Sequence, residues 1–366
     1  MTYLFLLIIL CYALLLAAML FGVQKVPELA IDKKQTKAFS IIIPFKDEAE
    51  NIPILLESFR LLNYPKNKYE ILMVDDQSTD NSVKIIKKYS DLPIQVLSSK
   101  NRTGSPKKEA LLLGIQQAKF NWIITTDADC KIPDNWLNAY DSSLRKTTVK
   151  MILGPVKFFE SNAFLSQFQQ IEFLSLQAMT IGSLGLKKPF LSNGANFGFE
   201  KQAFFAVDAY KGNTELASGD DVFLLEKFHQ KYPEQIYFLK TKEAIVQTKT
   251  QKDIKNLIQQ KIRWGGKTLH YQSFLPKFVG LLVLFSNFLI LIGFFLVFFE
   301  IKYIWFILLK LLTDAFYIKK INKMYRAHLH PINFLATFIF YPFWLIMISI
   351  FSLKGEFQWK GRVYKQ

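Results

Sequence analysis

The feature that most constrains this chain is a charge-free apolar run, Leu4–Phe21, close to its start. Its length matches the roughly 20 apolar residues that a helix needs to cross a bilayer. A cleaved signal peptide needs basic residues before such a run, but here the first basic residue, Lys25, follows it. Basic flanks stay on the cytoplasmic side of a membrane. The sequence therefore predicts a membrane helix over residues 1–24, with the N-terminus outside and the following residues in the cytoplasm.

Three further apolar runs lie near the other end of the chain. Phe278–Phe299 is uninterrupted, Tyr303–Ile318 is weakened by two charged residues, and Ile332–Leu353 contains Pro342. Basic segments flank the third run on both sides, and both favour the cytoplasm. Two interpretations stay open: a re-entrant hairpin bent near Pro342, or a basic tail that departs from the rule.

The middle of the chain has a different pattern, in which β-rich runs alternate with helical ones. The β-rich runs are FSIIIPF, YEILMVDD, PIQVLSS and WIITTDAD. Such alternation predicts a parallel sheet with helices on both faces. Ligands of these sheets bind at the carboxyl ends of the strands.

Composition narrows the choice of partners. Lys and Arg outnumber Asp and Glu by 46 to 30, a net charge of +16, which favours anionic partners. Because the chain also has long apolar runs, we expect contact with anionic lipid and no nucleic acid. The two cysteines support neither a disulfide framework nor a paired-cysteine metal site. The predicted organisation begins with a membrane helix (residues 1–24) and a cytoplasmic α/β domain (38–245). Amphipathic interfacial helices (246–276), a membrane region (277–354) and a basic tail (355–366) follow.

Carboxylates follow three of the predicted strands. They are Asp47 and Glu48, Asp75 and Asp76, and Asp127 and Asp129. The pair Asp127 and Asp129 could hold Mg²⁺ or Mn²⁺, which bind one or two carboxylates together with substrate phosphates. An Asp-x-Asp tripeptide alone is weak evidence, because many loops contain one. Asp75 and Asp76 could accept a hydrogen bond from a nucleotide base, whereas a helix cap explains Asp80 equally well.

Two other charged pairs precede apparent helices. Asp220 and Asp221 stand before VFLLEKF, where one could act as a general base and where Asp220 could simply cap the helix. Lys107 and Lys108 begin another helix and could bind phosphate there, or could be a solvated lysine pair.

The stretch DIKNLIQQKIRW predicts an amphipathic helix at the membrane surface, because its isoleucines and Leu257 share one face. Lys261 falls outside that face. On this helix Arg263 could bind a diphosphate, and Trp264 could stack on a sugar or an acceptor. The alternative is an Arg–Trp pair that anchors the helix among lipid headgroups.

Taken together, these motifs resemble the membrane-bound family 2 glycosyltransferases, which include cellulose and hyaluronan synthases and ceramide glucosyltransferase. The matching segments are SIIIPFKDEAENI, ILMVDDQSTDNS, KKEALLLGI, ITTDADC, NGANFGFEKQAF, SGDDVFL and QQKIRW. The resemblance implies a GT-A-type mixed sheet and inverting transfer from a UDP- or GDP-sugar. The ending WKGRVY is similar to that of ceramide glucosyltransferases and hints at a lipid acceptor.

The resemblance also implies roles for single residues. Asp221 matches the catalytic base, although the usual Glu-Asp is Asp-Asp here, which keeps Asp220 as a candidate. Asp129 with Asp127 matches the metal and diphosphate motif. The residues expected to bind substrate are Pro44, Asp47, Glu48, Asp75, Asp76, Lys107, Lys108, Asp127, Gly194, Asn196, Gln260, Arg263 and Trp264.

The sequence thus predicts an integral membrane enzyme, in a bacterial inner membrane, that transfers a sugar to a membrane lipid at the cytoplasmic face. A processive polysaccharide synthase is the second possibility, and an inactive membrane scaffold of the same fold is the third. The identity of the sugar, the nucleotide and the acceptor, and the oligomeric state, stay open.

Overall fold

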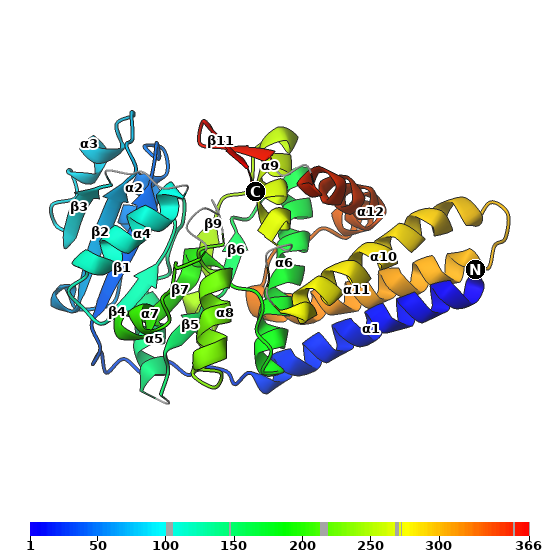
Figure 1. The fold of residues 1–366 in the computed structure, drawn as a ribbon, viewed down its shortest axis with the longest axis horizontal. Coiled ribbons are helices and arrows are strands. Elements are labelled where there is room, and N and C mark those ends of the chain that lie inside the picture. The colour runs from blue at the N-terminus through cyan, green and yellow to red at the C-terminus, as the bar shows by residue number, and fades with distance from the viewer. Residues whose placement is uncertain are drawn as a thin grey trace. The chain divides into compact units, whose positions relative to one another are not determined.

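A computed structural model describes residues 1–99, 105–145, 148–212, 219–267, 271, 273–353 and 356–365 of the chain (Figure 1). The chain forms two compact units. The sheet unit consists of Val26–Phe159 and Lys187–Lys249, and the helical unit of Met1–Lys25, Glu160–Leu186 and Thr250–Gln366. The division differs from the predicted domain bounds, because residues 160–186 lie inside the predicted α/β domain but join the helical unit.

The sheet unit is built on one mixed sheet of seven strands in the order β3-β2-β1-β4-β7-β5-β8. The strands are β1 (Phe39–Phe45), β2 (Tyr69–Asp75), β3 (Ile94–Ser98), β4 (Trp122–Thr125), β5 (Met151–Leu153), β7 (Phe197–Glu200) and β8 (Ile236–Phe238). The first four are mutually parallel, and β7 runs antiparallel to both of its neighbours. A separate parallel pair joins β6 (Val156–Phe158) to β9 (Val246–Thr248). The predicted mixed α/β sheet is confirmed.

Helices of the sheet unit pack on the apolar strands. They are α2 (Ile52–Arg60), α3 (Ser82–Ile86), α4 (Pro106–Gln117), α5 (Trp136–Leu144), α7 (Lys201–Ala206) and α8 (Val222–Lys231), with single 3-10 turns at Lys66–Lys68 (η1), Gly194–Asn196 (η2) and Lys242–Ala244 (η3). Helix α4 lies against β1 and β2. Gly114 makes this approach possible, since a Cβ there would lie 2.5 Å from Cγ2 of Ile42.

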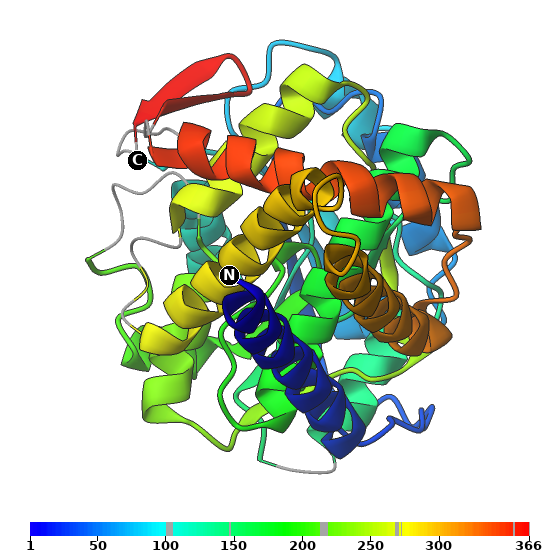
Figure 2. The same ribbon diagram turned by 90° about the vertical axis from the view of Figure 1, so that its right-hand side faces the viewer.

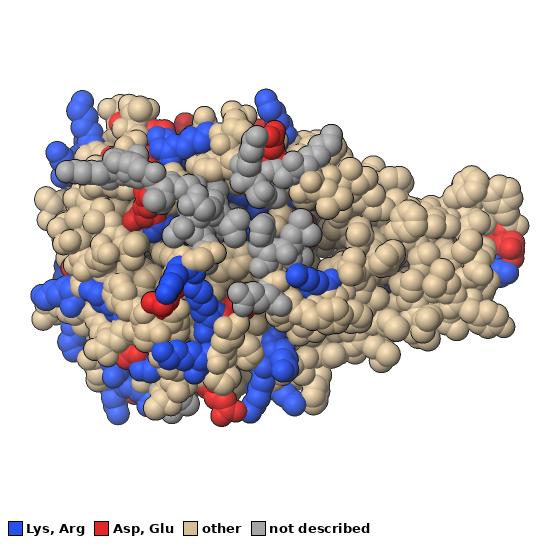
Figure 3. Space-filling model, in the orientation of Figure 1, with Lys and Arg blue, Asp and Glu red and all other residues tan. Residues whose placement is uncertain are grey.

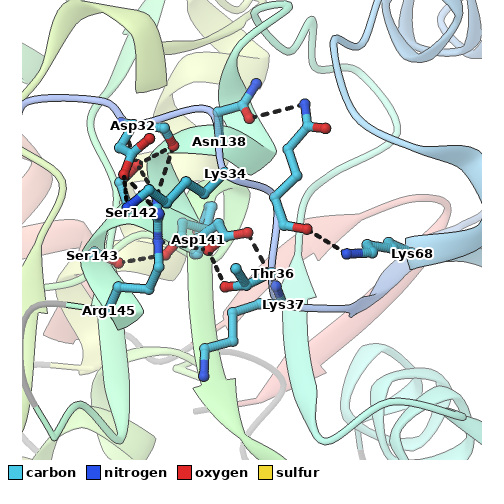
Figure 4. Close-up of polar contacts among 12 residues, drawn as sticks. Asp32, Lys34, Thr36, Lys37, Lys68, Asn138, Asp141, Ser142, Ser143 and Arg145 are labelled. Atoms are coloured by element: carbon cyan, nitrogen blue, oxygen red, sulfur yellow. Dashed lines mark hydrogen bonds and ion pairs between the residues drawn. The ribbon is translucent and has the colours of Figure 1, made fainter.

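The segment that precedes β1 is bound to α5 by side-chain hydrogen bonds (Figure 4). Ser142 accepts from the N–H of Asp32 at 2.8 Å and donates to its carbonyl at 3.0 Å. The buried carboxylate of Asp141 accepts from the hydroxyl of Thr36 and the N–H of Lys37, each at 3.0 Å. These bonds fix the path of the chain as it enters the sheet.

The helical unit contains α1 (Thr2–Lys25), α6 (Phe164–Gly185), α9 (Ile254–Gly265), α10 (Phe274–Leu296), α11 (Tyr303–Tyr325), α12 (Pro331–Leu353) and the hairpin β10–β11 (Glu356–Trp359, Arg362–Lys365). Helices α1, α10 and α11 pack side by side, and α12 crosses α10 (Figure 2). Of the described helices, α1, α10 and α12 are long and apolar enough to cross a membrane. Figure 3 shows that the surface over α1, α10 and α11 is almost free of charge.

Glycines let α1 and α6 approach very closely. A Cβ on Gly22 would lie 2.0 Å from the carbonyl oxygen of Gly182, and a Cβ on Gly185 would lie 1.9 Å from the carbonyl oxygen of Gly22. Small residues at such crossings are typical of membrane helices, where tight packing replaces the hydrophobic effect. This contact explains why residues 160–186 belong to the helical unit.

The structure excludes one of the two open interpretations of the last apolar run and corrects the assignment of Lys261. Helix α12 continues through Pro342, so the run at Ile332–Leu353 is one helix and not a re-entrant hairpin. Lys261 is buried instead of lying outside the apolar face of α9, because its ammonium pairs with Glu172 of α6 at 2.5 Å. Ile254, which was assigned to that apolar face, is exposed.

Candidate active site

The loops that follow β1 and β2 are joined by hydrogen bonds at the carboxyl edge of the sheet. Asp47 adopts a left-handed backbone conformation, with φ of +50°. Its N–H donates to the hydroxyl of Ser78 at 3.0 Å, and its carboxylate accepts from the N–H of Thr79 at 2.7 Å. The hydrogen bond from Thr79 is the main reason that the pKa of Asp47 lies below its ordinary value. Asp47 is therefore an ionised residue that orders this edge.

The other predicted residues of this edge have distinct surroundings. Pro44 pairs in register with Val74 of β2. Asp75 accepts a hydrogen bond from the N–H of Ser78 at 2.9 Å, whereas Asp76 is buried and is held to β1 through its own N–H. The Asp75 carboxylate thus orders the loop after β2, and contact of Asp75 or Asp76 with a nucleotide base stays a prediction.

Glu48 is tied to the start of α2. Its carboxylate accepts from the side-chain amide of Asn51, and the amide oxygen of Asn51 accepts from the ammonium of Lys249. The N–H of Glu48 donates to Ser82 at 2.9 Å. Glu48 thus connects the first loop to α3 and to the chain that follows β9.

Lys107 joins two of the predicted carboxylate motifs. Its ammonium lies 2.9 Å from Oδ1 of Asp127, after β4, and 3.4 Å from Oδ2 of Asp220, before α8. Burial alone lowers the pKa of Lys107, but the charges of Asp127, Asp220 and Asp221 outweigh burial and raise it. The lysine is therefore a fixed positive charge between residues that are 93 positions apart in the chain.

Asp221 is the cap of α8. Its carboxylate accepts from the N–H of Val222 at 2.8 Å and from the N–H of Gly194 at 3.0 Å. The prediction that Asp220 caps this helix is wrong, because the carboxylate of Asp220 points to Lys107 instead. Asp221 is thereby held by two backbone donors from separate segments.

Gly194 lies directly against this cluster. A Cβ built on it would be 3.4 Å from Oδ2 of Asp220 and 3.8 Å from the ammonium of Lys107. A side chain longer than Ala would cover the three charged groups. Glycine at this position therefore keeps the charged cluster open.

Asn196 was predicted to bind substrate, but its hydrogen bonds are all made within the protein. Its oxygen accepts from Trp136 and from Tyr140, both at 2.9 Å. Its amide donates to the carbonyls of Pro155 and Ala244 at 2.9 and 2.8 Å. A fully buried side chain with this set of partners supports the backbone that carries Gly194.

Asp127 and Asp129 fit a divalent metal only in part. Within the residues that the structure describes, no group of three or more His, Cys, Asp or Glu side chains could hold a metal ion. Two half-exposed carboxylates at a strand end do match Mg²⁺ or Mn²⁺, because these ions take further ligands from substrate phosphates. Burial, followed by the charges of both aspartates, raises the pKa of Cys130 well above its ordinary value, so this neighbour is a neutral thiol.

The structure adds residues that sequence reasoning missed. Tyr210 is buried near the cluster, and burial followed by the charges of Asp220 and Asp221 raises its pKa. Nothing in the sequence pattern distinguishes Tyr210 from the other tyrosines, because its proximity to the aspartates depends on the tertiary fold.

Lys108, predicted to bind substrate, is buried with its ammonium 5.7 Å from the ring centre of Phe223.

The predicted motif of α9 belongs to the helical unit. The ammonium of Lys261 lies 4.4 Å from the ring centre of Trp264, and that ring packs on Phe173. Oε1 of Gln260 is buried and has no hydrogen-bond partner among the described residues. The roles of Gln260, Arg263 and Trp264 toward a substrate stay predictions.

Comparison with known proteins finds relatives for the segment that carries most of the sheet. Residues 40–205 match the model of the family described as glycosyl transferase family 2. Glycosyltransferase AglE of Haloferax volcanii is 31% identical over 140 residues, which cover 38% of this chain and 45% of AglE. An undecaprenyl-phosphate 4-deoxy-4-formamido-L-arabinose transferase of Yersinia enterocolitica is 36% identical over 110 residues, covering 28% of this chain and 32% of that protein.

A solved structure shows the same fold over nearly the whole chain. Mannosyltransferase PcManGT of Pyrobaculum calidifontis aligns with a TM-score of 0.56 and 16% identity, covering 96% of both chains. The chain spans less than half of the two sequence relatives that it matches. Residues 40–205 of this chain are therefore similar to a glycosyl transferase family 2 domain.

Proposed function

We propose that this protein is an inverting glycosyltransferase that moves a sugar from a UDP- or GDP-sugar to a membrane lipid at the cytoplasmic face. The observation that carries the proposal is the cluster in which Lys107 bridges Asp127 and Asp220, with Asp221 held beside them. Acidic groups for a metal, a fixed positive charge and an oriented carboxylate are the groups that such a transfer needs.

The relatives support both substrates. The PcManGT structure contains GDP-mannose and Mn²⁺, which supports a nucleotide-sugar and a divalent metal for a domain of this fold. The Yersinia relative is named for undecaprenyl phosphate, a lipid-linked substrate. Within the described residues, three helices are long and apolar enough to cross a membrane, which agrees with a substrate that is a membrane lipid.

Asp221 is the residue that we propose as the base. Two backbone N–H groups fix its carboxylate, so its orientation does not depend on a flexible side chain. Asp221 takes the proton from the acceptor hydroxyl, and the oxygen of that hydroxyl then bonds to the anomeric carbon. The bond from this carbon to the diphosphate breaks with inversion. Asp220 pairs with Lys107 and positions its ammonium.

Asp127 and Asp129 would hold Mg²⁺ or Mn²⁺ with the help of the donor phosphates. The metal, when bound, neutralises the charge of the departing nucleotide diphosphate. Lys107 lies beside Asp127 and adds a second positive charge to that place. Asp76 is proposed to bind the base of the nucleotide, and Arg263 is proposed from its motif to bind the diphosphate.

The cluster of Lys107, Asp127 and the Asp220–Asp221 pair argues against an inactive scaffold, because all the carboxylates that the proposed catalysis requires are present. A polysaccharide synthase needs a polymer channel, usually made by more spans than the helices found here. We also propose that the protein resides in a bacterial inner membrane, with the sheet unit in the cytoplasm and its basic surface near anionic lipid.

The test uses the full chain in lipid nanodiscs with a panel of radiolabelled UDP- and GDP-sugars and an extract of membrane lipids. Wild-type protein should transfer label from one donor to organic-soluble lipid, and Asp221→Asn should not. Label found only in a polymer would replace the proposal with the synthase. Absence of transfer from every donor, with folded protein, would reject the proposed activity.

A further inference from the structure

The helical unit contains a partly open cavity of about 100 Å³ that the proposed chemistry does not use. Its walls come from α1, α6, α10, α11 and α12, the helices seen together in Figure 2. Most of the lining is apolar, as expected between membrane helices. Six lining residues carry polar groups that bear on a ligand: Tyr12, Glu172, Asn287, Lys310, Asp314 and Tyr317.

The charges in this cavity cancel one another. Lys310, whose side chain is 3% exposed, lies 2.7 Å from Oδ2 of Asp314, and Tyr12 donates to Oδ1 of Asp314 at 2.7 Å. Glu172 is paired with Lys261. Ionisable residues among membrane helices are costly and are commonly functional. The described charged residues of the wall therefore present a polar surface without net charge.

Two further polar atoms are buried at this wall and unsatisfied. The hydroxyl of Tyr317 and Oδ1 of Asn287 have no hydrogen-bond partner within the part of the chain that the structure describes. Both side chains are at least 98% buried. Each such atom costs free energy unless a ligand or water bonds to it. One is a donor and the other an acceptor, which together match a hydroxyl group.

We propose that this cavity binds the hydroxyl-bearing head of an uncharged membrane lipid. A hydroxyl can accept a hydrogen bond from Tyr317 and donate one to Asn287, the two lining residues with unsatisfied polar atoms. A lipid phosphate fits less well, because Asp314 already neutralises Lys310 and the phosphate would bring an unmatched negative charge. That this lipid is also the sugar acceptor rests on the proposed function.

The sequence relatives do not indicate whether the head group of this lipid is charged or neutral. Their matches cover 38% and 28% of the chain and the family model ends at residue 205, whereas α10, α11 and α12 lie beyond it. The cavity walls are thus contributed mainly by segments outside the matched domain. This protein can therefore bind a neutral lipid even though its sheet domain resembles that of relatives named for a lipid phosphate.

The test is photolabelling of the full chain in phosphatidylcholine nanodiscs without a sugar donor. The probes are a photoreactive diacylglycerol and a photoreactive polyprenyl phosphate, each at several concentrations. Diacylglycerol should label a peptide of α11 or α12, and unlabelled diacylglycerol should compete. Tyr317→Phe should weaken labelling about two- to tenfold, the effect of one hydrogen bond. Tyr303→Phe, the same change on the same helix outside the cavity, should label normally.

Three outcomes would overturn the proposal: equal labelling of Tyr317→Phe and wild type, preference for the phosphate probe, or no specific labelling, as expected if the cavity holds only water. Asp221→Asn should keep full labelling, which separates this site from the chemistry. If labelling follows the expected pattern but no lipid is glycosylated, the site stands and the proposed function fails. Thermal unfolding of each variant checks that it is folded.

Discussion

The ammonium of Lys107 lies 2.9 Å from the carboxylate of Asp127. Lys107 lies in the first turn of α4, and Asp127 follows β4. Their contact therefore lies at the carboxyl edge of the sheet, where the donor phosphates are expected to bind. The same ammonium reaches Asp220 at 3.4 Å. Lys107 therefore connects the proposed metal residues to Asp220, the neighbour of the proposed base.

Removing this charge should weaken donor binding. Lys107→Met leaves Asp127 and Asp220 without their shared cation, so both repel a diphosphate. We expect affinity for the nucleotide diphosphate to fall about tenfold, equivalent to about 1.4 kcal/mol, in calorimetry with metal present. Lys88→Met, at an exposed position of the same unit, is the matched control. Equal affinity in both variants would show that Lys107 has no part in donor binding.

The two adjacent aspartates should differ in their effects. Asp221→Asn keeps an oxygen that can cap α8 but loses the base, so turnover should fall by about 10²–10⁴ with donor binding retained. Asp220→Asn should weaken donor binding through Lys107 and lower turnover less. Radiolabelled transfer and calorimetry measure the two effects separately. The opposite order of turnover would make Asp220 the base.

Activity should depend on a divalent metal. Excess chelator should abolish transfer, and Mg²⁺ or Mn²⁺ should restore it. Asp129→Asn should weaken metal-dependent nucleotide diphosphate binding about tenfold or more, whereas Asp134→Asn, exposed five residues later, should not. Full transfer in chelator would remove the metal from the proposal.

Much of the sheet unit could be predicted from the sequence. The sequence predicts a strand over FSIIIPF, and β1 spans Phe39–Phe45. A short run of apolar residues bounded by polar ones is typical of a buried strand. The identity of the cap could not be predicted. Asp220 and Asp221 are adjacent and chemically alike, and only the position of Lys107 from another helix decides which carboxylate turns to α8.

The helical unit was harder to predict. Helix α6 lies between strands in the chain, and its contacts with α1, α11 and α12 assign it to the helical unit. Lys261 looked solvated because its partner, Glu172, is far away in sequence. Asn196 looked like a ligand residue because its motif lies near the site, whereas its four partners come from three other segments.

Protonation of Asp141 should destabilise the sheet unit. Burial by itself raises the pKa of this carboxyl, but hydrogen bonds from Tyr64, the N–H of Lys37 and Thr36 outweigh burial and hold it below the ordinary value. A pKa that is lower in the folded state stabilises the fold above the unfolded value of about 3.9. This stabilisation should be complete at neutral pH and lost as the pH falls below about 4.

The variant that tests this is Asp141→Asn. It should lower the free energy of unfolding by roughly 1.5–3 kcal/mol at pH 7, the range for hydrogen bonds to a charged group. Asp208→Asn, at an exposed surface pair, should change it little. Chemical denaturation at pH 7 and at about pH 2 measures both. A wild type and Asp141→Asn of equal stability at pH 7 would contradict the prediction.

The crossing of α1 and α6 should be intolerant of a single added carbon. In Gly22→Ala the new Cβ would start 2.0 Å from the carbonyl oxygen of Gly182, so the backbones must separate. Overpacking of this kind costs about 1–3 kcal/mol. Gly293→Ala is the same change in α10, where the Cβ would meet its nearest atom at an ordinary 3.4 Å, and alanine favours the helix. Thermal unfolding in detergent should therefore show a lower midpoint for Gly22→Ala and an unchanged or higher one for Gly293→Ala. Equal midpoints for the two variants would mean that the close contact of α1 with α6 does not hold in the folded protein.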